Sequence, residues 1–163
     1  MPLSRFNVRA YGILLNDKSQ ILVADELIKG QQTTKFPGGG LELGEGLKDG
    51  LIREFKEECN VDVHVSDHFY TTDFFVPSAF DHDSQMISVY YLCTCPDWQH
   101  IQAKTNKFDY VEIPGKDAEA FRWVHVTELV LETDVNLAID KVVMAMLIEK
   151  YSKSNEHVPH TNA

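Results

Sequence analysis

Three glutamates lie close together in the sequence at a spacing that could hold a metal ion. Glu54, Glu57 and Glu58 stand at positions i, i+3 and i+4, so on an α-helix their carboxylates share one short patch of surface. Like charges at this spacing repel each other, which predicts a positive partner among them. Magnesium selects oxygen ligands and commonly bridges a few carboxylates to substrate phosphates. The alternative is a solvated acidic helix face, which charge runs often form.

The residues before and around these glutamates predict a loop followed by a helix. The run Pro37–Gly40 is rich in glycine, whose free backbone dihedrals allow main-chain groups to approach a metal or a phosphate. A helix over residues 47–59 follows, because apolar residues recur there every four positions: Leu47, Leu51 and Phe55. Gly50 inside this helix costs about 1 kcal/mol relative to alanine, which predicts the close approach of another backbone.

Together these residues resemble the Nudix box, G-x5-E-x7-R-E-U-x-E-E-x-G-U, where U is a bulky apolar residue. Residues 39–61 match the pattern in order at eight positions: Gly39, Glu45, Arg53, Glu54, Phe55, Glu57, Glu58 and Val61. Asn60 departs from it, because the family has glycine there. Asparagine also tolerates the left-handed conformation that closes a helix, so we expect the turn to be kept.

The resemblance implies a Nudix hydrolase, which cleaves a nucleoside diphosphate linked to another group by attack of water at phosphorus. It also implies a Mg²⁺ cofactor, for which Mn²⁺ could substitute. The implied metal ligands are the Gly38 carbonyl and the carboxylates of Glu54, Glu57 and Glu58. Such an ion lowers the pKa of a coordinated water and neutralises charge on phosphate oxygens.

The other catalytic residues implied by the resemblance are an ion pair and a general base. Arg53 and Glu45 are expected to form a pair that orients the helix carboxylates, rather than an exposed pair worth little energy. The general base is expected among the box glutamates or in a later loop, where Glu119 is a candidate. Glu57→Gln and Glu58→Gln are each expected to abolish most turnover while the fold stays intact.

The substrate is less well specified than the reaction. Some family members that act on ADP-ribose carry a proline about sixteen residues beyond the box, and Pro77 lies 16 residues after Val61. A proline at a strand end is equally ordinary turn chemistry. We expect ADP-ribose or a nucleotide sugar, cleaved to a nucleoside monophosphate and a phosphorylated product. The aromatic residues beyond the box could stack on a base, but most are expected in the core: Phe74, Phe75, Phe80 and Tyr90.

Two other functions remain open at this stage. One is a pyrophosphohydrolase that acts on nucleoside triphosphates or dinucleoside polyphosphates. The other is a non-catalytic Nudix module that senses a nucleotide, although such modules typically lose box glutamates and all three are present here.

Composition limits the partners and the number of domains. The 163 residues suffice for one domain, which we place at residues 1–151, with a polar C-terminal tail at residues 152–163. The formal net charge of −10 argues against binding to nucleic acid or to anionic membranes, because Lys and Arg bind phosphate backbones. We therefore expect a small-molecule nucleotide as the partner. A homodimer is compatible with the family resemblance.

The cysteines and the apolar runs predict a cytoplasmic location. Cys59, Cys93 and Cys95 are odd in number and show no metal-ligand spacing, so we expect free thiols in a reducing compartment. The N-terminus lacks an apolar signal core, and no apolar run reaches membrane-spanning length.

The expected elements agree with the Nudix fold, a mixed β-sheet between helices in an α/β/α sandwich. Residues 6–15 and 20–24 read as a hairpin, and residues 25–34 as a polar loop that leads to an exposed Lys35. His82, between two aspartates, reads as part of a solvated turn rather than a metal site. Further elements are expected as strands at residues 61–65, 69–76, 86–94 and 121–126, and a helix at residues 135–151.

Overall fold

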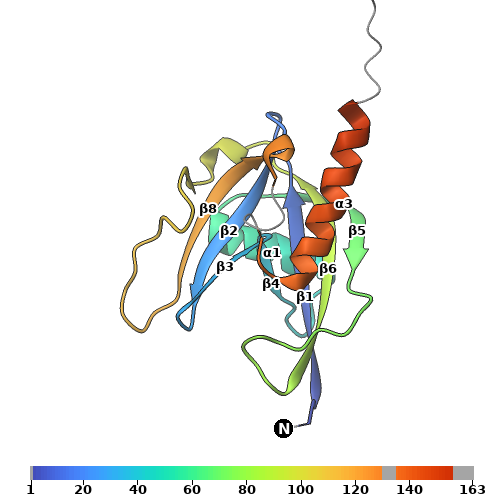
Figure 1. Cartoon of the computed structure of the whole chain (residues 1–163), viewed down its shortest axis with the longest axis vertical. Helices are drawn as coiled ribbons and strands as arrows, with labels where there is room; N and C mark the ends of the chain where they lie inside the picture. Colours follow the sequence, from blue (N-terminus) through green and yellow to red (C-terminus); the bar gives the residue numbers. More distant parts are fainter. Residues whose placement is uncertain (1, 130–134, 156–163) are drawn as a thin grey trace, which may run out of the picture.

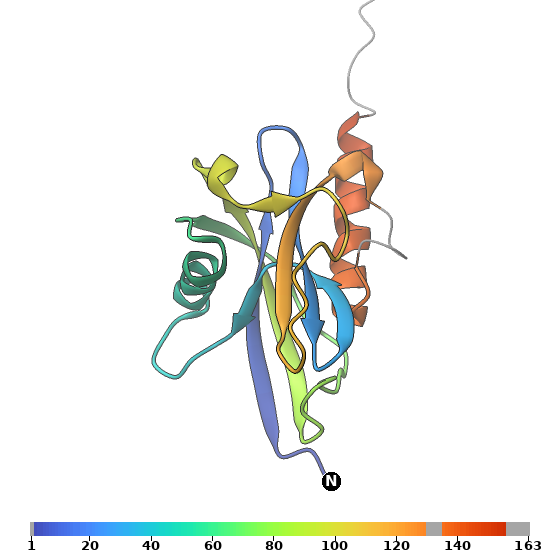
Figure 2. The same cartoon turned by 90° about the vertical axis from the view of Figure 1, so that its left-hand side faces the viewer.

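The computed structural model describes residues 2–129 and 135–155 and shows strands lying between two helices (Figures 1 and 2). The helices are α1 (Leu47–Cys59) and α3 (Ala138–Asn155), and two short 3₁₀ turns are η1 (Trp98–His100) and η2 (Val126–Glu128). The strands are β1 (Arg5–Leu14), β2 (Gln20–Ile28), β3 (Gln31–Lys35), β4 (Gly38–Gly40), β5 (His64–Thr71), β6 (Ser84–Thr94), β7 (Ala103–Lys104) and β8 (Ala118–His125).

The strands form two mixed sheets, each with four strands among the described residues. Their orders are β4-β1-β6-β5 and β3-β2-β8-β7. The pairs β1–β6 and β7–β8 are parallel, and the other pairs are antiparallel. In Figure 2, α1 lies on one side of the strands and α3 on the other. The predicted α/β/α sandwich is therefore confirmed, with its strands divided between two sheets.

The first two strands are not a simple hairpin, so that prediction was wrong. β1 pairs with β6 along its whole length and β2 pairs with β8, and β1 meets β2 only at the isolated bridge Leu15–Ile21. The turn between them is closed by Asn16, whose Oδ1 accepts the N–H groups of Lys18 and Gln20 at 3.0 Å. Ala10 to Leu14 are all buried, as expected for a strand covered on both faces.

The predicted polar loop over residues 25–34 is also wrong, because β2 continues to Ile28 and β3 begins at Gln31. The polar residues near its two ends, Asp25, Glu26, Thr33 and Thr34, are buried, and Asp25 shows how such groups obtain partners. Asp25 accepts hydrogen bonds from the Thr34 hydroxyl and from Arg122 Nε, both at 2.7 Å. Buried polar groups that have hydrogen-bond partners are compatible with a sheet interior, although residues of these types are also typical of a loop.

Each helix packs through an apolar face onto the strands. On α1, Leu51 and Phe55 are buried, as the four-residue spacing predicts. A Cβ at Gly12 would lie 2.5 Å from the Phe55 ring, so the helix rests directly on the backbone of β1. On the opposite side, α3 buries Val143 and Leu147 against the strands.

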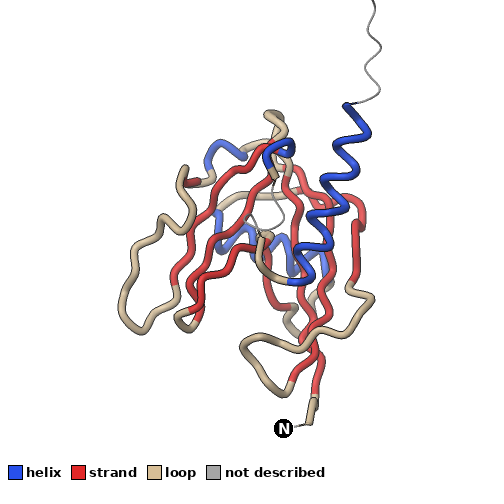
Figure 3. Tube along the Cα trace, in the orientation of Figure 1, coloured by secondary structure: helices blue, strands red, loops and turns tan. Residues whose placement is uncertain are grey.

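The remaining elements agree with the sequence in kind and differ mainly at their ends. The strands predicted at residues 61–65 and 69–76 correspond to one strand, β5, which begins at His64 and ends at Thr71 (Figure 3), so the prediction of two separate strands was wrong. The last helix begins later than predicted and runs to Asn155, past the proposed domain end at residue 151. The rest of the proposed tail, residues 156–163, lies outside the described residues.

The cysteines behave as expected, and the turn at residues 81–83 contacts β1. All three thiols are free, and those of Cys93 and Cys95 are buried. Asp81 and Asp83 accept ion pairs from Arg5 at 2.6 and 3.1 Å, so they tie the turn to β1. Neither helix in the described parts of the chain is long and apolar enough to cross a membrane.

Candidate active site on helix α1

Helix α1 carries the box glutamates, and its end has the geometry expected from Asn60. The Asn60 backbone is left-handed, with φ 54° and ψ 35°, and its N–H donates to the Lys56 carbonyl. Asparagine therefore supplies the turn that glycine supplies in the family pattern. As a result, the helix stops directly after Glu58 and Cys59, and both face a hollow described below.

Arg53 supplies a positive charge beside the clustered glutamates. Its Nη2 lies 2.7 Å from Glu45 Oε1 and its Nε lies 3.0 Å from Glu45 Oε2, so the pair is bidentate. Nη2 also donates to the Gly40 carbonyl at 3.1 Å, and Nη1 reaches Glu54 at 3.1 Å and Glu57 at 3.3 Å. One guanidinium thus connects α1 to the loop after β4.

Hydrogen bonds from Arg53 and from the backbone at Glu42 lower the pKa of Glu45 to about 2. The Glu45 carboxylate also lies where a side chain at Gly50 would be, since a Cβ there would be 2.7 Å from Glu45 Oε1. Gly50 is therefore explained by the approach of a carboxylate, and the expected approach of another backbone was wrong. The absence of a side chain at position 50 gives Glu45 room to reach Arg53.

Glu54 lies against the glycine-rich strand β4. A Cβ at Gly39 would come within 2.4 Å of the Glu54 Cδ and Oε1 atoms, so only glycine leaves space for this carboxylate. The Glu54 side chain is 15% exposed, whereas that of Glu57 is 59% exposed. Glu54 is therefore held in place from two sides, by Gly39 and by Arg53.

Glu58 has a buried carboxylate oxygen without a partner. Its Oε2 makes no hydrogen bond in the described structure. Burial and the neighbouring Glu54 carboxylate raise the pKa of Glu58 to about 7, while Lys35 acts in the opposite direction. Glu119, on β8, joins the same group of carboxyls. Loss of hydration and the proximity of Glu58 raise the pKa of Glu119 to about 8, although the residue as a whole is exposed.

Lys35 is buried at the centre of these carboxyls, so its predicted exposure was wrong. Its Nζ lies 2.8 Å from Glu26 Oε1 and donates to the Gly38 carbonyl at 3.0 Å. Burial opposes its charge, but Glu26 holds the pKa of Lys35 above the usual value. A buried charge needs a partner of this kind. The Gly38 carbonyl, the implied metal ligand, is thus already in contact with an ammonium group.

The residues present fit a hard divalent cation, although no three acidic, histidine or cysteine side chains in the described structure surround one point as ligands. Glu58 offers an unpartnered oxygen, and Glu54 lies one helical turn away with its carboxylate fixed. The available donors are all oxygens, which suits Mg²⁺ or Mn²⁺ rather than a softer metal.

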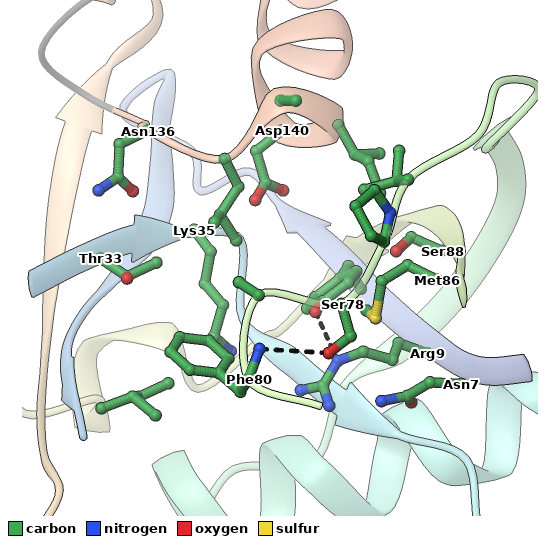
Figure 4. A pocket seen from close by; sticks show the side chains of 18 of the residues that line it. Asn7, Arg9, Thr33, Lys35, Ser78, Phe80, Met86, Ser88, Asn136 and Asp140 are labelled. Atoms are coloured by element: carbon green, nitrogen blue, oxygen red, sulfur yellow. Dashed lines mark hydrogen bonds between the residues drawn. The ribbon is translucent and has the colours of Figure 1, made fainter. Parts of the chain in front are cut away.

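Two hollows flank these carboxyls. The first, here called the α3 cavity, has a volume of about 590 Å³ and is bounded by β1, β3, β6, the loop before β6 and the start of α3 (Figure 4). The second, the α1 hollow, measures about 520 Å³ and lies between the end of α1 and the segment 101–111. Glu26 and Lys35 line the cavity, whereas Glu58 and Glu119 line the hollow.

Residues predicted for substrate recognition are divided between these surfaces and the exterior. Pro77 and Phe80 line the α3 cavity, and Tyr90 forms part of its wall while lying in the core. Phe74 and Phe75 are 40% and 59% exposed, and Phe80 is half-buried, so the prediction that most of the four aromatic residues lie in the core was wrong.

Sequence reasoning missed several polar residues at the site: Arg9, Glu26, Asn136 and Asp140. Their spacing carries no motif, because strands and a helix far apart in the chain bring them together. The alternation of β1 offered one signal, since Asn7, Arg9 and Tyr11 share one strand face and all line the cavity.

The family model of the NUDIX domain matches residues 5–146 of this chain, which include helix α1 and the sheets on which it packs. The chain belongs to the Nudix hydrolase family, as the motif predicted. Two relatives are RNA pyrophosphohydrolases, from Marinomonas sp. (strain MWYL1), 40% identical over 52 residues, and from Ruthia magnifica subsp. Calyptogena magnifica, 38% identical over 55 residues. These matches span 32% and 33% of the chain and only 31% and 30% of the relatives.

Solved structures share the fold over most of the chain. A MutT protein from Methanosarcina mazei Go1 is 16% identical with a TM-score of 0.61, and the alignment covers 94% of this chain and 97% of that one. A structure described as a UDP-X diphosphatase is 14% identical with a TM-score of 0.58, covering 95% of this chain and 66% of the other. At such low identity these similarities support the fold alone.

Proposed function

We propose that this protein is a metal-dependent pyrophosphohydrolase that cleaves a nucleoside diphosphate linked to another moiety. The observation that carries the proposal is the unpartnered, buried Oε2 of Glu58 beside the fixed carboxylate of Glu54. Leaving such an atom without a partner costs about 1–3 kcal/mol, which a bound cation would recover. The bidentate Arg53–Glu45 pair supports the same role, because it fixes the loop relative to the helix.

In this proposal Glu54, Glu57, Glu58 and the Gly38 carbonyl hold Mg²⁺, with Mn²⁺ as a substitute. When bound, the ion supplies charge neutralisation at the phosphates and a more acidic water. Arg53 orients Glu54 and Glu57, and Lys35 keeps the Gly38 carbonyl in position. Glu119 is the proposed general base, since its carboxyl lies close to that of Glu58 and lines the same α1 hollow.

For the substrate we propose ADP-ribose or a nucleotide sugar. A substrate of this kind has a bulky group on each side of its pyrophosphate, and hollows of about 590 and 520 Å³ lie on the two sides of the carboxyls. The products would be a nucleoside monophosphate and a sugar phosphate. The free thiols support a reducing, cytoplasmic setting for this small-molecule reaction.

A second candidate is a pyrophosphohydrolase that acts on a triphosphate, including the 5′-triphosphate end of an RNA. The names of the two partial relatives favour it. The net charge of −10 opposes it for RNA, because a long polyanion would be repelled. Release of inorganic pyrophosphate from a triphosphate would identify this reaction.

The test is a panel of ADP-ribose, nucleotide sugars, nucleoside triphosphates, dinucleoside polyphosphates and a 5′-triphosphate RNA, incubated with Mg²⁺ or Mn²⁺ and analysed by mass spectrometry. We expect a nucleoside monophosphate from the first two classes and loss of most turnover in Glu57→Gln and Glu58→Gln. Tight nucleotide binding without any product would instead identify a sensing module. Near-normal turnover of both variants would refute the assigned roles.

A further inference from the structure

The two hollows meet at a wall made of carboxyls and one ammonium. Glu26 on β2 and Glu119 on β8 are direct partners in the strand register, so their side chains project from the same face of the sheet. On that face Glu26 and Lys35 line the α3 cavity, whereas Glu119 and Glu58 line the α1 hollow. A ligand whose pyrophosphate rests at this wall would therefore extend into both hollows.

Arg9 lies at the edge of the α3 cavity that faces helix α1 (Figure 4). Its Nε donates to the Tyr11 hydroxyl at 2.6 Å, and its guanidinium lies 5.6 Å from the centre of the Tyr11 ring. Its two Nη nitrogens make no hydrogen bond to the described residues, which leaves a fork of N–H donors directed at the cavity edge. A Cβ at Gly40 would lie 3.8 Å from Arg9 Nη1 and a Cβ at Gly39 would lie 2.4 Å from Glu54 Cδ, so Arg9 and Glu54 lie beside neighbouring residues of β4 and this edge adjoins the proposed metal site.

The contacts with Tyr11 orient Arg9 before any ligand arrives. A guanidinium fixed at Nε and over an aromatic ring loses little freedom on binding, and its geometry matches two oxygens of one phosphate. A surface arginine without such contacts would present no fixed fork. The described neighbours of Arg9 also include no carboxylate within ion-pair distance, so an anion from outside could occupy the fork.

The rest of the α3 cavity suits a nucleoside rather than a sugar. Its wall is largely apolar and aromatic, with Phe80, Met86 and Tyr90, and polar atoms are few. Its volume of about 590 Å³ lies within the usual range for small-ligand pockets. The α1 hollow is more polar, since Gln102, Lys104 and Asp109 line it, and it suits the second half of the substrate.

We infer that Arg9 binds the phosphate attached to the nucleoside, that the nucleoside lies in the α3 cavity, and that the second moiety of the substrate lies in the α1 hollow. This inference rests on the proposed function and adds to it the direction in which the substrate lies. It assigns nucleoside recognition to β1, β6 and α3, and recognition of the second moiety to the segment 101–111.

The two parts of the inference are tested separately. The place of the nucleoside monophosphate is tested by measuring the binding of this product in the absence of catalysis. Isothermal titration with the four nucleoside 5′-monophosphates and the matching nucleosides, in the presence of EDTA, should show that at least one monophosphate binds more tightly than its nucleoside. Arg9→Met should weaken that monophosphate by about 10–100-fold and bring it to the affinity of the nucleoside. Lys18→Met, which removes the same charge from the exposed turn after β1, should leave the affinity unchanged.

Lys104→Met tests the second half. The variant should leave monophosphate binding unchanged and raise the KM of the intact substrate at least about threefold, because the Lys104 side chain lines the α1 hollow and not the α3 cavity. Absence of monophosphate binding in the wild type, or wild-type affinity in Arg9→Met, would overturn the inference even if turnover is normal. If Arg9-dependent binding is found but no substrate of the panel is cleaved, the proposed function fails while the place of the nucleoside monophosphate stands.

Discussion

The substitution Gly39→Ala tests the importance of the position of the Glu54 carboxylate, because the new methyl group would displace this carboxylate. The new Cβ would lie 2.4 Å from Glu54 Cδ, about 1 Å closer than the 3.4 Å at which ordinary contact begins. The backbone at Gly39 does not have a positive φ, so alanine is compatible with the strand itself. Glu54 must therefore swing away, while the main chain of β4 stays in place.

A displacement of about 1 Å at a reacting centre can lower the rate by about 100-fold. We expect kcat/KM to fall by that order and Mn²⁺ affinity, measured by electron paramagnetic resonance, to fall with it. The free energy of unfolding should change by no more than about 1–3 kcal/mol, because the clash involves the end of a movable side chain.

The neighbouring glycine provides a matched control. A Cβ at Gly40 would have Arg9 Nη1 as its nearest neighbour, at 3.8 Å, which is an ordinary contact. Gly40→Ala should therefore keep Mn²⁺ affinity and stability close to the wild type. Wild-type turnover and Mn²⁺ affinity in Gly39→Ala, or equal losses in both variants, would refute the reasoning.

Three further changes test other parts of the structure. Arg53→Lys should lower kcat/KM at least about tenfold without unfolding the protein, because lysine cannot hold Glu45 and Gly40 together, and unchanged kinetics would contradict this. Lys35→Met should destabilise the fold by about 3–5 kcal/mol in urea titrations by leaving Glu26 buried without its partner, and adding Glu26→Gln should restore part of the loss. Burial raises the pKa of Asp140 to about 7, so its contribution to stability is complete below about pH 4 and is lost as the pH rises through 7. Asp140→Asn should flatten the pH dependence of the urea midpoint over that window; an unchanged slope would show that Asp140 does not cause it.

The sequence predicted helix α1 and its glutamates well, because the signals for this helix are local. Glycine conformation, four-residue apolar spacing and the i, i+3, i+4 carboxylates all act within one short segment, so Arg53, Glu45 and Glu54 lie together as expected. Asn60 closes the helix in the left-handed conformation for the same reason. Local rules of this kind need no knowledge of the tertiary structure.

The sequence could not predict contacts between distant segments. The polar sequences of β2 and β3 are typical of a loop. Asp25 and Lys35 are buried in the structure because Arg122 and Glu26, on other positions of the sheet, pair with them. Exposed Phe75 shows the opposite error, in which an aromatic residue on a β-prone stretch lies outside the core. Both errors arise because burial depends on partners far along the chain.

The contact of the Phe55 ring with the backbone at Gly12 holds helix α1 on strand β1, and this contact does not involve the loop segments that line the two hollows. Helix α1 is fixed to the backbone of β1 at that point, whereas the walls of both hollows include residues 76–81 and 102–111, which lie outside the core cluster around Phe55. Insertions or exchanges in those segments would alter which molecule is accepted while leaving the chemistry in place. A related protein could therefore acquire a different substrate specificity through changes in these segments while helix α1 and its glutamates stay unchanged.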